Sequence, residues 1–108
     1  MDASTEEAAA QRHEQLVAAM RRSVVDGEGF TDPALRRAAA SGGELPELLA
    51  AYVHKVRDES YRITDADIAA LRGSGYGEEE IFEITIATAV GAASRRLEAG
   101  LRALQAGR

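Results

Sequence analysis

Apolar residues recur at intervals of three and four along most of the chain, the spacing of one face of an α-helix. Leu16, Met20 and Val24 form one such stripe, and glycine or proline residues interrupt the pattern before each new stripe begins. No segment alternates apolar and polar residues as a half-buried strand does. The pattern therefore predicts an all-α fold of about five helices, over residues 5–25, 33–41, 46–57, 65–72 and 78–106.

The last predicted helix is the longest, and its middle segment, residues 84–93, carries no charge. A helix that is apolar on every side has to be covered on every side. A chain of this length has a small core of its own, which a second subunit would enlarge. We therefore expect a long, central C-terminal helix in a homo-oligomer, with the subunit interface at Ile84, Ala87, Val90 and Gly91.

The length and charge of the chain limit the classes of protein to which it can belong. The 108 residues predict a single domain, 1–108. There are 13 Lys and Arg residues against 18 Asp and Glu residues, a formal net charge of −5, so we expect no nucleic-acid partner, because that binding depends on neutralising phosphates. No apolar run approaches the roughly 18 residues of a membrane span, and a signal-peptide pattern is absent from the first residues. We predict a cytoplasmic protein with no membrane association.

The chain contains no cysteine, which excludes thiol nucleophiles, thiolate metal ligands and disulfide redox chemistry. The candidate catalytic base is His54, which lies one helical turn before Asp58 and can pair with that carboxylate. Glu47 lies two turns before His54, but two carboxylates and one histidine make a poor ligand set. We expect neither a metal ion nor a cofactor.

Four other residues are candidates for a site. Glu83 is an acidic residue that enters the apolar part of the last helix, where it could form an ion pair between helices or subunits, or act as a catalytic carboxylate. Tyr52 lies close to His54 in the sequence. Arg95 and Arg96 follow the apolar segment and could bind a substrate carboxylate, because a guanidinium group matches carboxylate geometry.

The C-terminal half resembles a known family. Thr64-Asp65-Ala66-Asp67 opens one helix with a capping residue and acidic side chains, and Glu78-Glu79-Glu80-Ile81-Phe82-Glu83 opens the next, which is Ala-rich and continues to Arg96-Leu97. Over residues 61–104 this succession is similar to the carboxymuconolactone decarboxylase and alkylhydroperoxidase D-like superfamily. The resemblance implies an all-α fold and obligate homo-oligomers that assemble through the long helix.

The sequence departs from the redox members of that superfamily, which carry a Cys-x-x-Cys motif followed by a histidine. When His54 is aligned with the family histidine, Glu47 and Ala50 stand at the two cysteine positions. We therefore expect thiol peroxidase activity to be absent. The decarboxylase branch works without thiols, and the resemblance implies that His54 is the counterpart of its histidine.

Two functions from different classes follow from these observations. The first is a non-redox, self-assembling accessory or interaction subunit that could serve a partner enzyme, and its basis is the long apolar helix. The second is a cofactor-free decarboxylase or isomerase that acts on a small carboxylic acid or lactone. In that enzyme His54 would act as acid or base, and Arg95 or Arg96 would bind the substrate. A third hypothesis is a module that binds a small ligand or a metal ion.

Overall fold

The computed structural model describes residues 3–107, with side chains described from residue 5 onward. Its elements are α1 (Ala3–Asp26), α2 (Pro33–Ser41), α3 (Glu47–Asp58), the single 3₁₀ turn η1 (Ser60–Arg62), α4 (Asp65–Gly73) and α5 (Glu78–Ala106). No β-strand occurs within this described range. The predicted all-α fold of about five helices is confirmed, and each helix lies close to its predicted bounds.

The ends of α2 follow from its sequence. The Asp32 carboxylate accepts a hydrogen bond from the Ala34 N–H at 2.9 Å, and Pro33 occupies the first helical turn, where a missing N–H costs nothing. At the other end, Gly42 adopts a φ of 83° and its N–H donates to the Ala38 carbonyl at 2.9 Å. Glycine suits this left-handed position because it has no Cβ. The helix is therefore short and sharply bounded.

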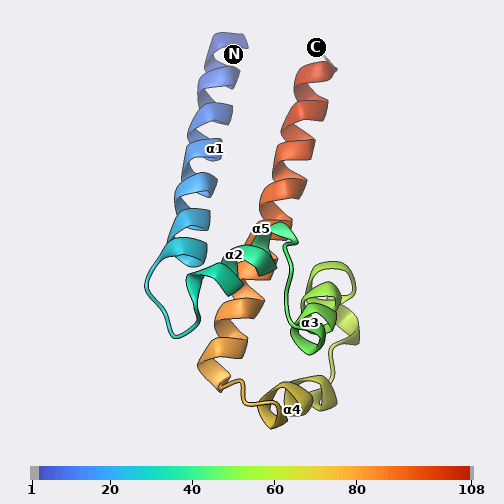
Figure 1. Ribbon diagram of the computed structural model, residues 1–108. Helices are drawn as coiled ribbons and strands as arrows, with labels where there is room; N and C mark the ends of the chain where they lie inside the picture. Colours follow the sequence, from blue (N-terminus) through green and yellow to red (C-terminus); the bar gives the residue numbers. More distant parts are fainter. Residues whose placement is uncertain (1–2, 108) are drawn as a thin grey trace.

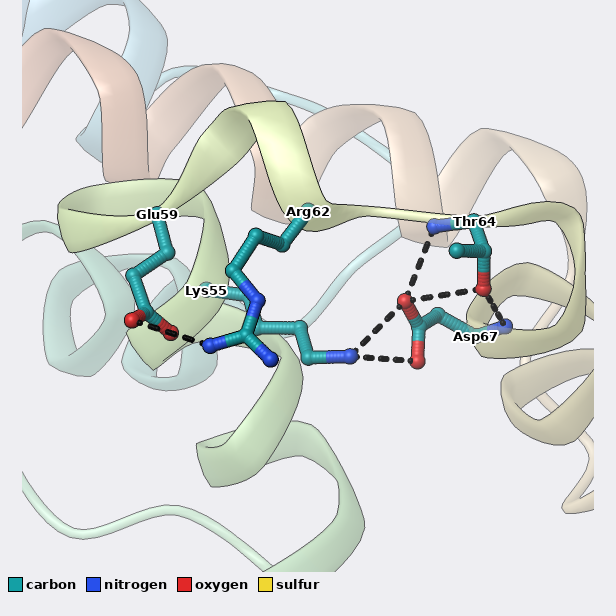
Figure 2. A network of polar contacts seen from close by, with 5 residues as sticks. All are labelled: Lys55, Glu59, Arg62, Thr64 and Asp67. Carbon is teal, nitrogen blue, oxygen red and sulfur yellow. Dashed lines mark hydrogen bonds and ion pairs between the residues drawn. The ribbon is translucent and has the colours of Figure 1, made fainter.

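A polar network holds the start of α4 against α3 (Figure 2). The Thr64 hydroxyl accepts the Asp67 N–H, while the Asp67 carboxylate accepts the Thr64 N–H at 2.9 Å, so the two residues form a capping box. Lys55 reaches across from α3 and places its Nζ 3.0 Å from both Asp67 oxygens. The backbone bond from Thr64 and the bond from Lys55 lower the pKa of Asp67. A separate pair, Arg62 with Glu59, spans η1 at 3.3 Å.

The molecule is elongated, with extents of 55 × 28 × 21 Å. Figure 1 shows α1 and the second half of α5 side by side and running in opposite directions, so both ends of the chain lie at one end of the molecule. Helix α2 crosses α5 near its middle, while α3 and α4 lie around its first half. We call residues 25–94 the body, and the paired segments 5–24 and 95–106 the arm.

The hydrophobic core lies in the body, between the inner side of α5 and the three shorter helices. Its members are at most 6% exposed: Ala39 of α2, Leu49, Tyr52 and Val53 of α3, Leu71 of α4, and Ile81 and Ile84 of α5. A smaller cluster joins the end of α1 to α2 and α5 through Val25, Ala40 and Ala87. The α5 helix is therefore central to the body, as its apolar segment predicts.

Three of the four residues expected at a subunit interface are instead buried inside the protomer. Ile84 and Ala87 are 1% and 0% exposed. At Gly91 the backbones of α2 and α5 touch, because a Cβ atom there would lie 2.1 Å from the Ala40 carbonyl oxygen. Val90 keeps part of its surface open. The apolar spacing of the sequence correctly indicates that this side of α5 is buried. The helices that bury it, α2 and α3, belong to the same chain.

Candidate functional site

His54 lies on the solvent-exposed side of α3. Its Nδ1 is 3.1 Å from an Asp58 carboxylate oxygen, so the predicted pairing one helical turn apart is confirmed. Arg57 approaches the same nitrogen at 3.4 Å and also pairs with Asp58 at 3.1 Å. The His54 side chain is 59% exposed, which places this cluster on an open surface. Among the residues with described positions, no three histidine, aspartate or glutamate side chains are placed to hold a metal ion.

Tyr52 lies on the opposite side of α3 from His54, because residues two apart on a helix face different directions. Its ring belongs to the core, and its hydroxyl is 2.6 Å from the Thr85 hydroxyl on α5. Thr85 donates its own proton to the Ile81 carbonyl at 2.6 Å, so the Tyr52 hydroxyl is the donor to Thr85. Tyr52 therefore fastens α3 to α5, and the structure does not bring it together with His54.

Arg95 and Arg96 both hydrogen-bond to backbone carbonyl groups in the last turn of a neighbouring helix. Arg95 donates to the carbonyl of Ala40 in α2 at 2.5 Å, and Arg96 donates to the carbonyl of Arg57 in α3 at 3.1 Å. The last carbonyls of a helix have no partner within the helix and carry partial negative charge, so a guanidinium group stabilises them. Through Arg57, Arg96 lies close to the His54 cluster, whereas Arg95 lies with α2.

Arg36 has the same kind of role and was missed by the sequence analysis. It is 2% exposed, and its guanidinium donates to the Val24 carbonyl at 3.0 Å and to the Gly27 carbonyl, both at the C-terminal end of α1. One signal was present in the sequence, because Arg36 precedes the buried Ala39 and Ala40 by one helical turn and so lies on the apolar side of α2. A charged residue on that side needs buried partners.

Glu83 links the loop between α1 and α2 to the start of α5. One carboxylate oxygen accepts the Phe30 N–H at 2.8 Å, and the other accepts the Thr31 N–H at 2.7 Å. Burial acts to raise the pKa of Glu83, but these two backbone hydrogen bonds and the charge of Arg36 outweigh it, so the net pKa is lowered. The predicted carboxylate thus stays ionised and binds backbone amides.

An apolar stripe runs along the side of α5 that faces away from α2. We call it the outer stripe, and its residues are exposed or half-buried: Phe82, Ile86, Ala89, Val90, Ala93, Leu97, Gly100 and Leu104. Phe82 and Leu104, near its two ends, are 66% and 63% exposed. In the described part of the chain, no helix is long and apolar enough to span a membrane, α5 included. Within the arm, Leu97 and Leu104 also line hollows between α5 and α1, so the stripe borders α1 there.

The charges that border the outer stripe are held away from it. On a helical projection Glu83 and Arg96 lie at its two edges. Glu83 is bonded to the α1–α2 loop, and Arg96 is bonded to the end of α3. Phe30, which is 77% exposed, is fixed beside the first turns of α5 through its backbone bond to Glu83. Phe30 therefore adds apolar surface beside the start of the stripe, and the exposed Glu78 and Glu79 lie one helical turn before Phe82.

Comparison with known proteins does not extend these observations. The chain matches no protein-family model, no curated protein and no solved structure. The superfamily resemblance over residues 61–104 therefore remains a prediction from the sequence, and the function has to be argued from the geometry.

Proposed function

We propose that the protein is a non-redox accessory or interaction subunit that assembles with itself through the outer stripe of α5. The observation that carries this proposal is the exposed, uncharged surface that runs from Phe82 to Leu104. This segment is about 33 Å long at the rise of an α-helix. Monomeric soluble proteins rarely expose a continuous apolar surface of this extent. Covering it would remove apolar area from water, the main driving force for association.

The order of residues in the stripe favours a second copy of the same chain as the partner. If two α5 helices cross antiparallel about a twofold axis at Ala93, Phe82 of each copy faces Leu104 of the other, and Ile86 faces Gly100. At the axis, Ala93 faces its own copy, and small residues there let two helix backbones approach closely. Large residues thus face each other near the ends of the contact, and a small residue lies opposite Ile86 and at the axis, so the stripe can pair with a second copy of itself as a twofold interface requires.

The contacts within the protomer favour this proposal over a cofactor-free enzyme. The polar groups of Glu83, Tyr52, Arg95 and Arg96 are bonded to other groups of the chain, while His54 is open to solvent with Asp58. A general base needs a positioned substrate beside it. The predicted catalytic and substrate-binding residues are spread over different parts of the molecule, whereas the outer stripe is continuous.

Sedimentation equilibrium of the full chain tests the proposal, with Ala93→Glu as the variant. Two carboxylates would face each other at the twofold axis in a dry interface, so we expect a dimeric wild type and a monomeric variant. Ala99→Glu is the matched control, because it makes the same change at an exposed position of α5 outside the stripe. The proposal fails if the wild type sediments as a monomer at all concentrations, or if both variants behave alike.

A further inference from the structure

A cavity of about 640 Å³ lies between α1 and α5, where the arm joins the body. Its volume is in the range of small-molecule sites, about 300–1,000 Å³. The walls combine apolar side chains with arginines, and the residues that matter here are Val17, Arg22, Arg37, Ser94, Leu97 and Leu101. All of them belong to one protomer, so the cavity is complete without a second copy, and it shares Leu97 with the outer stripe.

The cavity is polar at its inner end and apolar further out. Helices α1 and α5 run in opposite directions (Figure 1), so Val25 and Ser94 belong to the part of the cavity nearer α2, while Val17 and Leu101 lie further along the arm. The inner end also contains Arg37 and Ser41 of α2. A ligand that fits this arrangement has a polar head directed toward α2 and an apolar chain directed along the arm.

Ser94 provides an independent sign of a missing partner at the inner end. The residue is 4% exposed, and its hydroxyl has no hydrogen-bond partner among the described residues. Other hydroxyls on the same helix bond to the carbonyl four residues earlier, as Thr88 does with Ile84 at 2.7 Å. Ser94 makes no such bond. A buried hydroxyl without a partner is costly, and a ligand head group would supply one.

The cations at the inner end indicate the charge of that head group. Arg37 is paired with Asp26 at 2.9 Å, whereas Arg21 and Arg22 form no ion pair with any described residue. An unpaired guanidinium group beside a free hydroxyl suits a carboxylate, which accepts hydrogen bonds from both. Three carboxylates also line the cavity: Asp26 is paired with Arg37, Glu98 lies one helical turn beyond Ser94, and Glu14 lies at the outer end.

We infer that the cavity binds a small carboxylic acid with an unbranched apolar chain. Its carboxylate would lie between Arg22 and the Ser94 hydroxyl, and its chain would lie against Val17, Leu97 and Leu101. Guanidinium and hydroxyl donors fix the orientation of the head group, and the leucines remove the chain from water.

Isothermal titration calorimetry with octanoate, below its micelle-forming concentration, tests this inference on the full chain. We expect one octanoate per protomer, with octylamine and 1-octanol binding far more weakly because they lack the carboxylate. Arg22→Gln should weaken octanoate binding roughly tenfold to a hundredfold, as expected when a charged hydrogen bond is removed. Arg12→Gln is the matched control, because it removes an exposed arginine from the same helix away from the cavity.

A second variant tests whether the Ser94 hydroxyl binds the carboxylate of the ligand. Ser94→Ala should weaken octanoate binding roughly twofold to tenfold, the effect of a neutral hydrogen bond, while Ser23→Ala on the exposed side of α1 should leave it unchanged. Thermal unfolding followed by circular dichroism establishes that all four variants are folded. Absence of octanoate binding at millimolar concentration, equal binding of octylamine, or equal effects of the Arg22 and Arg12 variants would each overturn the inference.

Discussion

The body and the arm contain similar apolar residues but differ in how far they bury them. In the body, core residues such as Leu49 and Leu71 are fully buried. In the arm, Leu16, Met20 and Leu104 are 68%, 53% and 63% exposed. The difference comes from the number of packing elements, because four helices enclose a core whereas two helices can cover only one side of each other. The number of apolar residues alone therefore does not determine which part of a chain can bury them without a partner.

The α5 helix takes part in both regions and shows the same contrast within one element. Its inner side is closed by α2 and α3, and Gly91 lets α2 approach to backbone contact. The residues of its outer stripe stay exposed or half-buried in the protomer. We expect substitutions on the inner side to change folding, and substitutions on the outer stripe to change association.

The largest expected effect comes from Ile84→Ala on the inner side. Removing a fully buried side chain leaves a cavity, so the free energy of unfolding should fall by roughly 2–5 kcal/mol. Urea denaturation at low protein concentration measures this. Phe82→Ala, two positions away on the outer stripe, is the control and should change protomer stability by less than about 0.5 kcal/mol. Equal losses for the two variants would remove the distinction between the two sides of α5.

A smaller effect is expected from Gly91→Ala. The new Cβ would meet the Ala40 carbonyl oxygen at 2.1 Å, so α2 has to shift, and we expect a loss of roughly 1–3 kcal/mol in the free energy of unfolding. Gly100→Ala is the matched control in the arm, where nothing lies within 4 Å of the new Cβ. Alanine has the higher helix propensity, so this variant should gain roughly 0.5–1 kcal/mol. A stabilised Gly91→Ala protein would contradict the close contact.

The smallest effect concerns the loop that joins the arm to the body. Glu83→Gln keeps the shape of the side chain but weakens its bonds to the Phe30 and Thr31 amides, which should cost roughly 1–2 kcal/mol near neutral pH. Because the pKa of Glu83 is lowered in the folded state, its contribution is complete above the ordinary glutamate pKa and is lost as the pH falls through the folded value.

A pH series of urea denaturations measures this dependence. Wild-type stability should decline on acidification below the ordinary glutamate pKa, and Glu83→Gln should decline less steeply. Asp67, whose pKa is also lowered, adds its own dependence of the free energy of unfolding on pH, and this part is the same in both proteins. An unchanged slope in the Glu83 variant would show that its carboxylate does not hold the loop.

Features that depend on neighbouring residues in the chain were accessible from the sequence. The five helices followed from apolar spacing, and the His54–Asp58 pair followed from residues one turn apart. The partners of Glu83 were not accessible, because they are backbone amides more than fifty residues earlier, and every residue but proline carries such an amide. The partner of Arg95 is likewise a backbone carbonyl, at Ala40.

The amino-acid sequence by itself determined that this protein is helical, where each helix lies, and that the chain has no cysteine. These properties depend on local spacing, end residues and composition. The tertiary structure alone decided which side of α5 is closed by its own chain, which carbonyls the arginines stabilise, and that a cavity lies between α1 and α5. Those properties depend on how closely distant segments approach, which is set by the packing of all the helices together.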